Sequence, residues 1–505
     1  MILDKKIYRD KVYACWIGKN IGGTMGTPYE GSREINDIAG FVTKEGEILP
    51  NDDLDLQLVW LYAMEQCGPH AVSAAMLGEH WLSLVTPHWN EYGLGKANMK
   101  RGLPPPLSGD YDNDWKNSNG AWIRTEIWAT TAPGLPHIAA SHAMEDASVD
   151  HGAGEGTYAA AFVAAMQSAA FVLSSLSDCI EVGLAAIPEK CRVHQSIRFL
   201  LECKEKGMDW KDARNAVQRL NADIGDGWFE APSNVAYTVL GLLWGEGDFK
   251  KSMITAINCG DDTDCTGATV GATLGILYGT AGIPEDWRSH IGDGIVTVSI
   301  AKGNNGKFVP KTCTELTERV VAIAPSVLYA AAQKYEKDPI RKVVKPLSKV
   351  LPNGAMALGE GSELPENAAA VLIELASLAR EKGEALVPYS MHFENVAFKA
   401  QLALSGEPQL APGEALSVRV SLQSKISLED EPRNLKFRWI LPEGWSASGK
   451  RTVMLHGFDP HSVGKGAMDF VITAGEAVDA ENRVVLEISE VGRFAPLYCS
   501  FVLLG

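Results

Sequence analysis

Two short acidic clusters contain the residues of this sequence best suited to chemistry. Asn51, Asp52 and Asp53 precede one apolar run, and Asp262 and Asp264 precede a long charge-free run. Burying neighbouring carboxylates costs far more free energy than a helix dipole returns, unless a cation neutralises them. Either cluster alone could be a surface helix cap. Because both clusters open apolar helices, they indicate the two halves of one metal site.

The donor atoms of these clusters decide which metal they would bind. Carboxylate and amide oxygens suit Mg²⁺, with Mn²⁺ or Ca²⁺ as alternatives. Cys259 and Cys265 flank the second cluster, but no His or Cys at the spacing of a zinc site accompanies them. The sequence therefore favours one or two hard divalent ions and argues against zinc.

Glu30 is a third candidate, at the end of the glycine-rich stretch GKNIGGTMGTPYE. A carboxylate there could act as a general base toward water. A solvated surface side chain is the simpler alternative for a lone glutamate in such a loop.

Helices must position these residues. Four glycines spaced four apart, Gly267, Gly271, Gly275 and Gly279, follow the second acidic cluster. Since each Gly in a helix interior costs about 1 kcal/mol relative to Ala, this spacing predicts a ridge against which another helix backbone packs closely. Apolar residues also recur at helical spacing over 55–66, 157–175, 195–204, 234–243 and 314–334. The stretch 85–135, rich in Pro, Gly and aromatic residues, is predicted to be a long loop that lines the site or packs on itself.

The pattern changes near residue 386 to short alternating runs separated by turn signals. These runs, which predict an all-β sandwich of immunoglobulin-like size, are 415–422, 435–441, 451–457, 468–473 and 483–489. We therefore expect an all-α domain at 1–334, a connecting segment with a helix at 335–385, and a β-sandwich domain at 386–505. The sandwich contains no catalytic cluster, so we expect it to shape the site, bind carbohydrate or build a homo-oligomer.

Bulk composition narrows the possible partners and compartment. The chain has 505 residues, is 46% hydrophobic and carries a net charge of −17. That charge argues against a nucleic acid or an anionic membrane as the main partner. The N-terminal residues do not resemble a signal peptide, and the nine cysteines include no CxxC pair. A reduced, cytoplasmic protein is expected, and the charge-free run 265–283 is too weakly hydrophobic to predict a membrane span.

Taken together, these motifs resemble those of the ADP-ribosylglycohydrolase family, an all-helical family of metal-dependent hydrolases. In the family's order, the chain contains GGTMGTPYE at 22–30, NDDL at 51–54, GDDTDC at 260–265 and IPEDW at 283–287. Weaker matches are SNGAWIR at 118–124 and VDHGAGEG at 149–156. The resemblance covers roughly residues 8–330 and leaves the β region out.

The resemblance implies three sets of site residues. The catalytic carboxylate is Glu30. The metal ligands are Asn51, Asp52, Asp53, Asp262, Asp264 and Cys265. The substrate pocket is lined by Asn119, Gly120, Arg124 and His151. The implied reaction is Mg²⁺-dependent hydrolysis of an ADP-ribosyl N- or O-glycosidic bond at the ribose anomeric carbon, in a small-molecule or protein-attached substrate.

Departures from the family pattern leave other functions open. Asn51 stands where the family has Thr, and Cys265 stands where it has a hydroxyl ligand, although a thiol is a poor ligand for Mg²⁺. These changes leave the identity of the substrate more open than the presence of the metal site. One alternative is a hydrolase of another furanoside, nucleoside or glycoside. The other is a binding homologue that has lost turnover.

Overall fold

The chain forms two compact units. The computed structural model describes residues 2–225, 228–301, 308–334, 356–357, 367–425, 433–455 and 464–505. The first unit comprises Met1–Pro87, Asn117–Ala147 and Gly154–Ala385, and the second comprises His88–Lys116, Ser148–Ala153 and Leu386–Gly505. Much of the expected connecting segment lies outside the described residues, so the domain boundaries expected from the sequence stay predictions.

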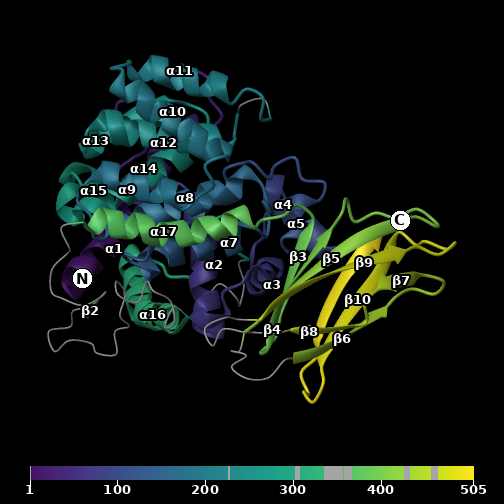
Figure 1. The fold of residues 1–505 in the computed structure, drawn as a ribbon. Helices are drawn as coiled ribbons and strands as arrows, with labels where there is room; N and C mark the ends of the chain where they lie inside the picture. Colours follow the sequence, from purple (N-terminus) through teal and green to yellow (C-terminus); the bar gives the residue numbers. More distant parts are fainter. Residues whose placement is uncertain are drawn as a thin grey trace. The chain divides into compact units, whose positions relative to one another are not determined.

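The first unit is helical, as the sequence predicts (Figure 1). Its longer helices are α1 (Lys5–Gly26), α2 (Asp52–Cys67), α3 (Ala74–Leu84), α7 (Pro136–Ala147), α8 (Glu155–Ala170), α9 (Leu176–Ala185), α10 (Arg192–Glu205), α11 (Trp210–Leu220), α12 (Ala231–Gly245), α13 (Phe249–Asn258), α14 (Thr263–Tyr278), α16 (Cys313–Lys334) and α17 (Ala368–Glu384). Two short ones are α6 (Glu126–Thr131) and α15 (Glu285–Ile291). Within the described residues, no helix is both long and apolar enough to cross a bilayer.

Helices α1 and α14 pack backbone to backbone along the glycines of both. A Cβ on Gly18 would lie 2.1 Å from the Gly271 carbonyl oxygen, and one on Gly22 would lie 2.1 Å from the Gly267 carbonyl. The predicted ridge is therefore confirmed at these positions and at Gly275. Gly279 lies outside the ridge, because it ends α14 with a φ of +70°, a conformation that favours glycine.

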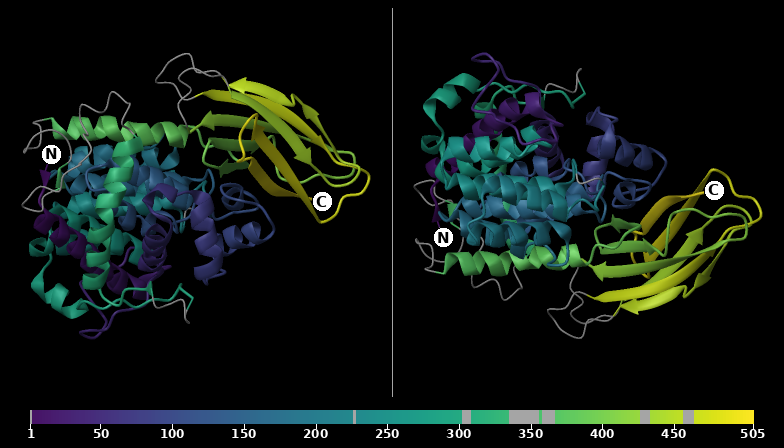
Figure 2. Two further views of the ribbon diagram at one scale, coloured as in Figure 1. Left: turned by 90° about the horizontal axis from the view of Figure 1, so that it is seen from below. Right: turned by 90° about the horizontal axis from the view of Figure 1, so that it is seen from above.

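The second unit is a β-sandwich of two antiparallel sheets, which Figures 1 and 2 show as two layers of strands. One sheet has the order β11-β10-β6-β8 and the other β3-β4-β5-β9-β7. The two-sheet β region is confirmed, while an immunoglobulin-like topology stays a prediction. The strands are β3 (Ser390–Glu394), β4 (Phe398–Leu404), β5 (Ala415–Ser424), β6 (Arg433–Ile440), β7 (Ser446–Gly449), β8 (Thr452–Leu455), β9 (Lys465–Thr473), β10 (Glu481–Glu490) and β11 (Leu497–Leu504).

Alternation along the strands builds the core of this unit. Buried and exposed residues alternate along β5 and β10, so each strand turns one face inward. Phe437 of β6 and Phe470 of β9 meet between the sheets, with ring centroids 5.7 Å apart. Leu103, Leu107 and Tyr111 belong to the same core. Residues 103–111 thus contribute to the hydrophobic core of the sandwich.

The prediction of a long loop over 85–135 was wrong. This stretch contains α4 (Asn90–Lys100) and α5 (Leu107–Asp110), followed by a 3₁₀ turn and α6. Some of its glycines are needed for close packing against other backbone atoms, whereas the sequence suggested that they were loop residues. A Cβ on Gly93 would lie 2.2 Å from the His88 carbonyl oxygen, and one on Gly109 would lie 2.2 Å from the Gly152 nitrogen.

Asp110 predicts a pH dependence of stability in the second unit. Asp110 is 3% exposed, and its carboxylate accepts hydrogen bonds from the backbone nitrogens of Ala153 at 2.9 Å and Tyr389 at 3.2 Å. Burial raises the pKa of Asp110 to about 6. The folded protein therefore holds the proton of the Asp110 carboxyl group more tightly than the unfolded chain does. As a result, the contribution of Asp110 to stability falls as pH rises from about 4 through 6.

We expect the stability difference between wild type and Asp110→Asn to be pH-dependent. From pH 4 to pH 7, the wild type should lose up to about 3 kcal/mol relative to the variant. Denaturant unfolding of both proteins across that range, followed by a probe in the β-sandwich, measures the difference. A difference that is constant with pH would show that Asp110 does not titrate there.

Candidate metal centre

Acidic residues that are distant in sequence converge in the first unit to form two overlapping groups. Glu30, Asp262 and Asp264 form one group, and Asp53, Asp264 and Cys265 form the other. Within each group, one potential ligand atom per residue lies within 4.8 Å of the others. Asp264 belongs to both groups. The structure therefore brings together five of the residues predicted from the sequence.

The packing of α1 against α14 explains this convergence. A Cβ on Gly26, the last residue of α1, would lie 2.4 Å from the Asp264 nitrogen. The chain leaves α1 through a 3₁₀ turn at Thr27–Tyr29, and Glu30 follows directly. The glycines of α1 thus place Glu30 beside the N-terminus of α14. Asp53 reaches the same region from the first turn of α2.

The carboxylate of Asp262 is directed to the site and not to helix capping. Asp262 is the N-cap residue of α14, yet its side chain makes no capping hydrogen bond. It is 5% exposed, and its Oδ1 atom accepts no hydrogen bond. The surface-cap alternative therefore fails for Asp262. By contrast, Asn51 does cap α2, because its Oδ1 accepts from the Asp53 nitrogen at 2.7 Å.

The electrostatics of the cluster favour a bound cation. Burial raises the pKa values of Asp53 and Asp262 well above the usual carboxyl range, and the charge of Asp264 raises them further. The charge of Asp264, followed by burial, raises the pKa of Glu30 to about 7. The Oδ2 atom of Asp53 and the Oδ1 atoms of Asp262 and Asp264 are buried and accept no hydrogen bond. A divalent cation would relieve both the repulsion and the lost hydration.

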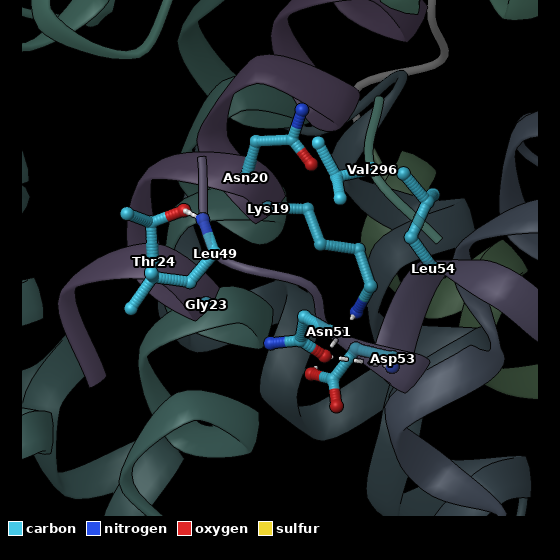
Figure 3. Close-up of a pocket in the computed structure, with 9 residues that line it drawn as sticks. All are labelled: Lys19, Asn20, Gly23, Thr24, Leu49, Asn51, Asp53, Leu54 and Val296. Carbon is cyan, nitrogen blue, oxygen red and sulfur yellow. Dashed lines mark hydrogen bonds and ion pairs between the residues drawn. The ribbon is translucent and has the colours of Figure 1, made fainter. Parts of the chain in front are cut away.

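Lys19 is a component of the centre that the sequence analysis missed. Its ammonium lies 3.7 Å from Asp53 Oδ2 and 3.1 Å from a Glu126 oxygen, and it donates to the Ile123 carbonyl at 2.7 Å. Figure 3 shows Lys19, Asn51 and Asp53 lining one small pocket. Lys19 is 2% exposed. A lysine within an apolar helix beside a glycine ridge is the signal that could have identified it.

The predicted substrate-binding residues of the first unit have clear packing roles. Asn119 donates from Nδ2 to Asp262 Oδ2 at 2.7 Å, and its Oδ1 accepts from Trp122 Nε1 at 2.9 Å. Arg124 is fully buried, pairs with Asp146 at 2.9 Å and donates to the Gly120 carbonyl at 2.6 Å. Their role in binding substrate stays a prediction. Asn119 orients Asp262, and Arg124 supports the backbone at Gly120, the residue next to Asn119.

We expect Asn119→Ala to weaken metal binding by about 10- to 100-fold, because it removes the hydrogen bond that orients Asp262. Trp122→Phe removes the donor that orients Asn119 and shrinks a fully buried ring, but it leaves the Asn119–Asp262 hydrogen bond in place, so its effect on metal binding should be smaller. Titration calorimetry with Mg²⁺ or Mn²⁺ measures both variants against wild type. Equal affinities in Asn119→Ala and wild type would contradict this role.

His151 lies in the second unit. Its Nδ1 atom is 2.9 Å from Asp150 Oδ1, and both residues are fully buried. With Glu91 they form a further group of potential ligand atoms. The predicted substrate contact of His151 therefore stays a prediction, as does metal ligation by Asn51 and by the half-buried Asp52.

Comparisons with known proteins place this geometry in context. The family model described as ADP-ribosylglycohydrolase matches residues 4–326. ADP-ribosylarginine hydrolase Tri1 of Pseudomonas putida (strain GB-1) is 26% identical over 299 residues, which are 56% of this chain and 74% of that protein.

Two solved structures show weaker likenesses. An ADP-ribosylglycohydrolase-related protein complex is 19% identical with a TM-score of 0.39, over 64% of this chain and 98% of that one. The GAE domain of GGA2p from Saccharomyces cerevisiae is 14% identical with a TM-score of 0.16, over 23% of this chain and 96% of that one.

Proposed function

Because the chain belongs to the ADP-ribosylglycohydrolase family, we propose that it hydrolyses an ADP-ribosyl N- or O-glycosidic bond at the ribose anomeric carbon with the help of a divalent cation. The observation that supports this most is the convergence of Glu30, Asp53, Asp262 and Asp264 within the segment that the family model matches. The relative named as an ADP-ribosylarginine hydrolase favours an arginine side chain as one leaving group to test.

The residues present fit a divalent cation. Three buried carboxylate oxygens accept no hydrogen bond, and hard oxygen donors dominate the set. Glu30, Asp262 and Asp264 would hold one ion, and Asp53 with Asp264 would contribute to a second. When bound, such a cation supplies a Lewis acid that attracts ribose hydroxyls and polarises water. Mg²⁺ is the ion that the oxygen-only group suits best, with Mn²⁺ or Ca²⁺ as alternatives.

The residues of the site have different proposed roles. Glu30 is the exposed member of the cluster, so its carboxylate can reach a water molecule and accept a proton as that water attacks the anomeric carbon. The buried aspartates would hold the cation in a fixed place beside Glu30. Asn119 holds Asp262 in place, and the Lys19 ammonium keeps Asp53 in a fixed position. Turnover then depends on positions that folding sets before substrate arrives.

A substrate panel with and without metal tests this proposal. The panel comprises peptides ADP-ribosylated on arginine, serine or glutamate, together with nucleosides and aryl furanosides. We expect release of ADP-ribose from at least one ADP-ribosyl substrate, and loss of that release with a chelator. Turnover of nucleosides or aryl furanosides alone would overturn the substrate class. Metal binding without any turnover would instead identify a binding homologue.

A further inference from the structure

The two overlapping ligand groups differ in donor chemistry. Glu30, Asp262 and Asp264 offer only carboxylate oxygens, whereas Asp53 and Asp264 are joined by the thiol of Cys265. Cys265 is 5% exposed, and its Sγ donates to Asp53 Oδ1 at 3.3 Å. One position of the centre therefore offers only hard oxygen donors, and the other includes a soft sulfur donor.

We propose that the group formed by Asp53, Asp264 and Cys265 binds a thiophilic divalent cation of the Zn²⁺ class in preference to Mg²⁺. This inference rests on the proposed function, because it specifies the metal chemistry of the same centre. Thiolate sulfur selects Zn²⁺, Co²⁺ and Cd²⁺ over Mg²⁺, which retains oxygen ligands and water. The centre would then hold unlike ions on either side of Asp264.

Two unsatisfied oxygen atoms support a ligand at this position. Asp264 Oδ1 and Asp53 Oδ2 are buried and accept no hydrogen bond, in residues that are 6% and 1% exposed. Both residues contribute to the group that contains Cys265. The Lys19 ammonium, 3.7 Å from Asp53 Oδ2, provides a single positive charge and also pairs with Glu126. Negative charge therefore remains for a cation to neutralise.

The alternative is that Cys265 is only a small buried side chain. Cys259, in the same region, is an example of such a buried structural cysteine. Its Sγ donates to the Thr255 carbonyl one turn earlier, and among the described residues it joins none of the groups of potential ligands. Cys265 instead reaches a carboxylate on α2, far away in the sequence. Cys and His partners are lacking nearby in the sequence, but the fold brings the distant carboxylate of Asp53 to Cys265.

At Cys265, binding exchanges one proton for one bond. The Cys265 sulfur binds the cation as the thiolate, so the S–H bond breaks, a sulfur–metal bond forms and the proton leaves to solvent. No oxidant or reductant is required.

Co²⁺ titration with spectroscopic detection tests the proposal. The protein should carry Cys67→Ser, because Cys67 is the exposed cysteine of the chain. Added Co²⁺ should produce a near-ultraviolet sulfur-to-metal charge-transfer band in the presence of excess Mg²⁺. Cys265→Ser should remove the band and lower the Co²⁺-to-Mg²⁺ affinity ratio by about tenfold or more. Cys259→Ser is the matched control and should retain the band.

Each outcome decides the question. Absence of the band in the Cys67→Ser protein, which does not depend on how any Cys265 variant folds, would overturn the proposal. Persistence of the band in Cys265→Ser would also overturn it. The substrate panel distinguishes this failure from failure of the proposed function. ADP-ribose release with Mg²⁺ but no charge-transfer band would refute only this inference, while a band without turnover of any ADP-ribosyl substrate would refute only the proposed function.

Discussion

Asp264→Asn is expected to lower kcat/KM by at least about 100-fold, the largest effect on activity in this chain. Asp264 is the residue that both ligand groups share, so its loss weakens both positions at once. Steady-state hydrolysis at a metal concentration that saturates the wild type measures the effect. Asp286→Asn, which removes an exposed carboxylate paired with Lys250, is the matched control and should leave activity unchanged.

The same substitution should stabilise the metal-free protein. Burial raises the pKa of Asp264, and its carboxylate in turn raises the pKa values of Glu30, Asp53 and Asp262. A neutral amide removes this repulsion, so the thermal midpoint in chelator should rise. Added metal should then raise the midpoint of wild type more than that of the variant. A variant that is less stable in chelator and still active would contradict the assignment of Asp264 as a ligand.

Gly22→Ala is expected to destabilise the first unit by about 3 kcal/mol or more, the largest effect on stability. A Cβ at this position would lie 2.1 Å from both the carbonyl carbon and the oxygen of Gly267. Backbone atoms cannot move aside without separating α1 from α14. The better helix propensity of Ala returns only about 1 kcal/mol, so the steric cost dominates. Denaturant unfolding of the metal-free protein measures the change.

Gly40→Ala is the matched control, because a Cβ on Gly40 would meet nothing within 4 Å. It should change stability by less than about 1 kcal/mol. Separation of α1 from α14 should also displace Glu30 from Asp264, so any Gly22→Ala protein that folds should bind metal more weakly. Wild-type stability and metal affinity in Gly22→Ala would refute the backbone contact between the two helices.

The sequence predicted those parts of the fold and site that depend on local patterns. The glycine spacing at Gly267, Gly271 and Gly275 identified close helix packing, since a helix repeat places these residues on one face. The acidic clusters identified Asp53, Asp262 and Asp264 because grouped carboxylates need a neutralising partner. Alternation of polar and apolar residues identified the strands of the sandwich.

Features set by tertiary contacts escaped prediction. Lys19 became part of the centre only when α1 brought it beside Asp53 and Glu126. The contact of Asn119 with Asp262 joins residues 143 positions apart. The stretch 85–135 was predicted to be a loop in part because Leu103 and Leu107 pack into the core of the β-sandwich and not onto neighbouring residues in the chain.

Hydrolysis of an ADP-ribosylated arginine peptide in heavy-oxygen water tests the central claim most directly. A single turnover with metal, quenched and examined by mass spectrometry, shows which product receives the oxygen of the attacking water. Attack at the anomeric carbon predicts one heavy oxygen in the released ADP-ribose and none in the peptide, with no release in chelator or with Asp264→Asn. Label in the peptide, or equal release in chelator, would contradict a metal-assisted hydrolase acting at the anomeric carbon.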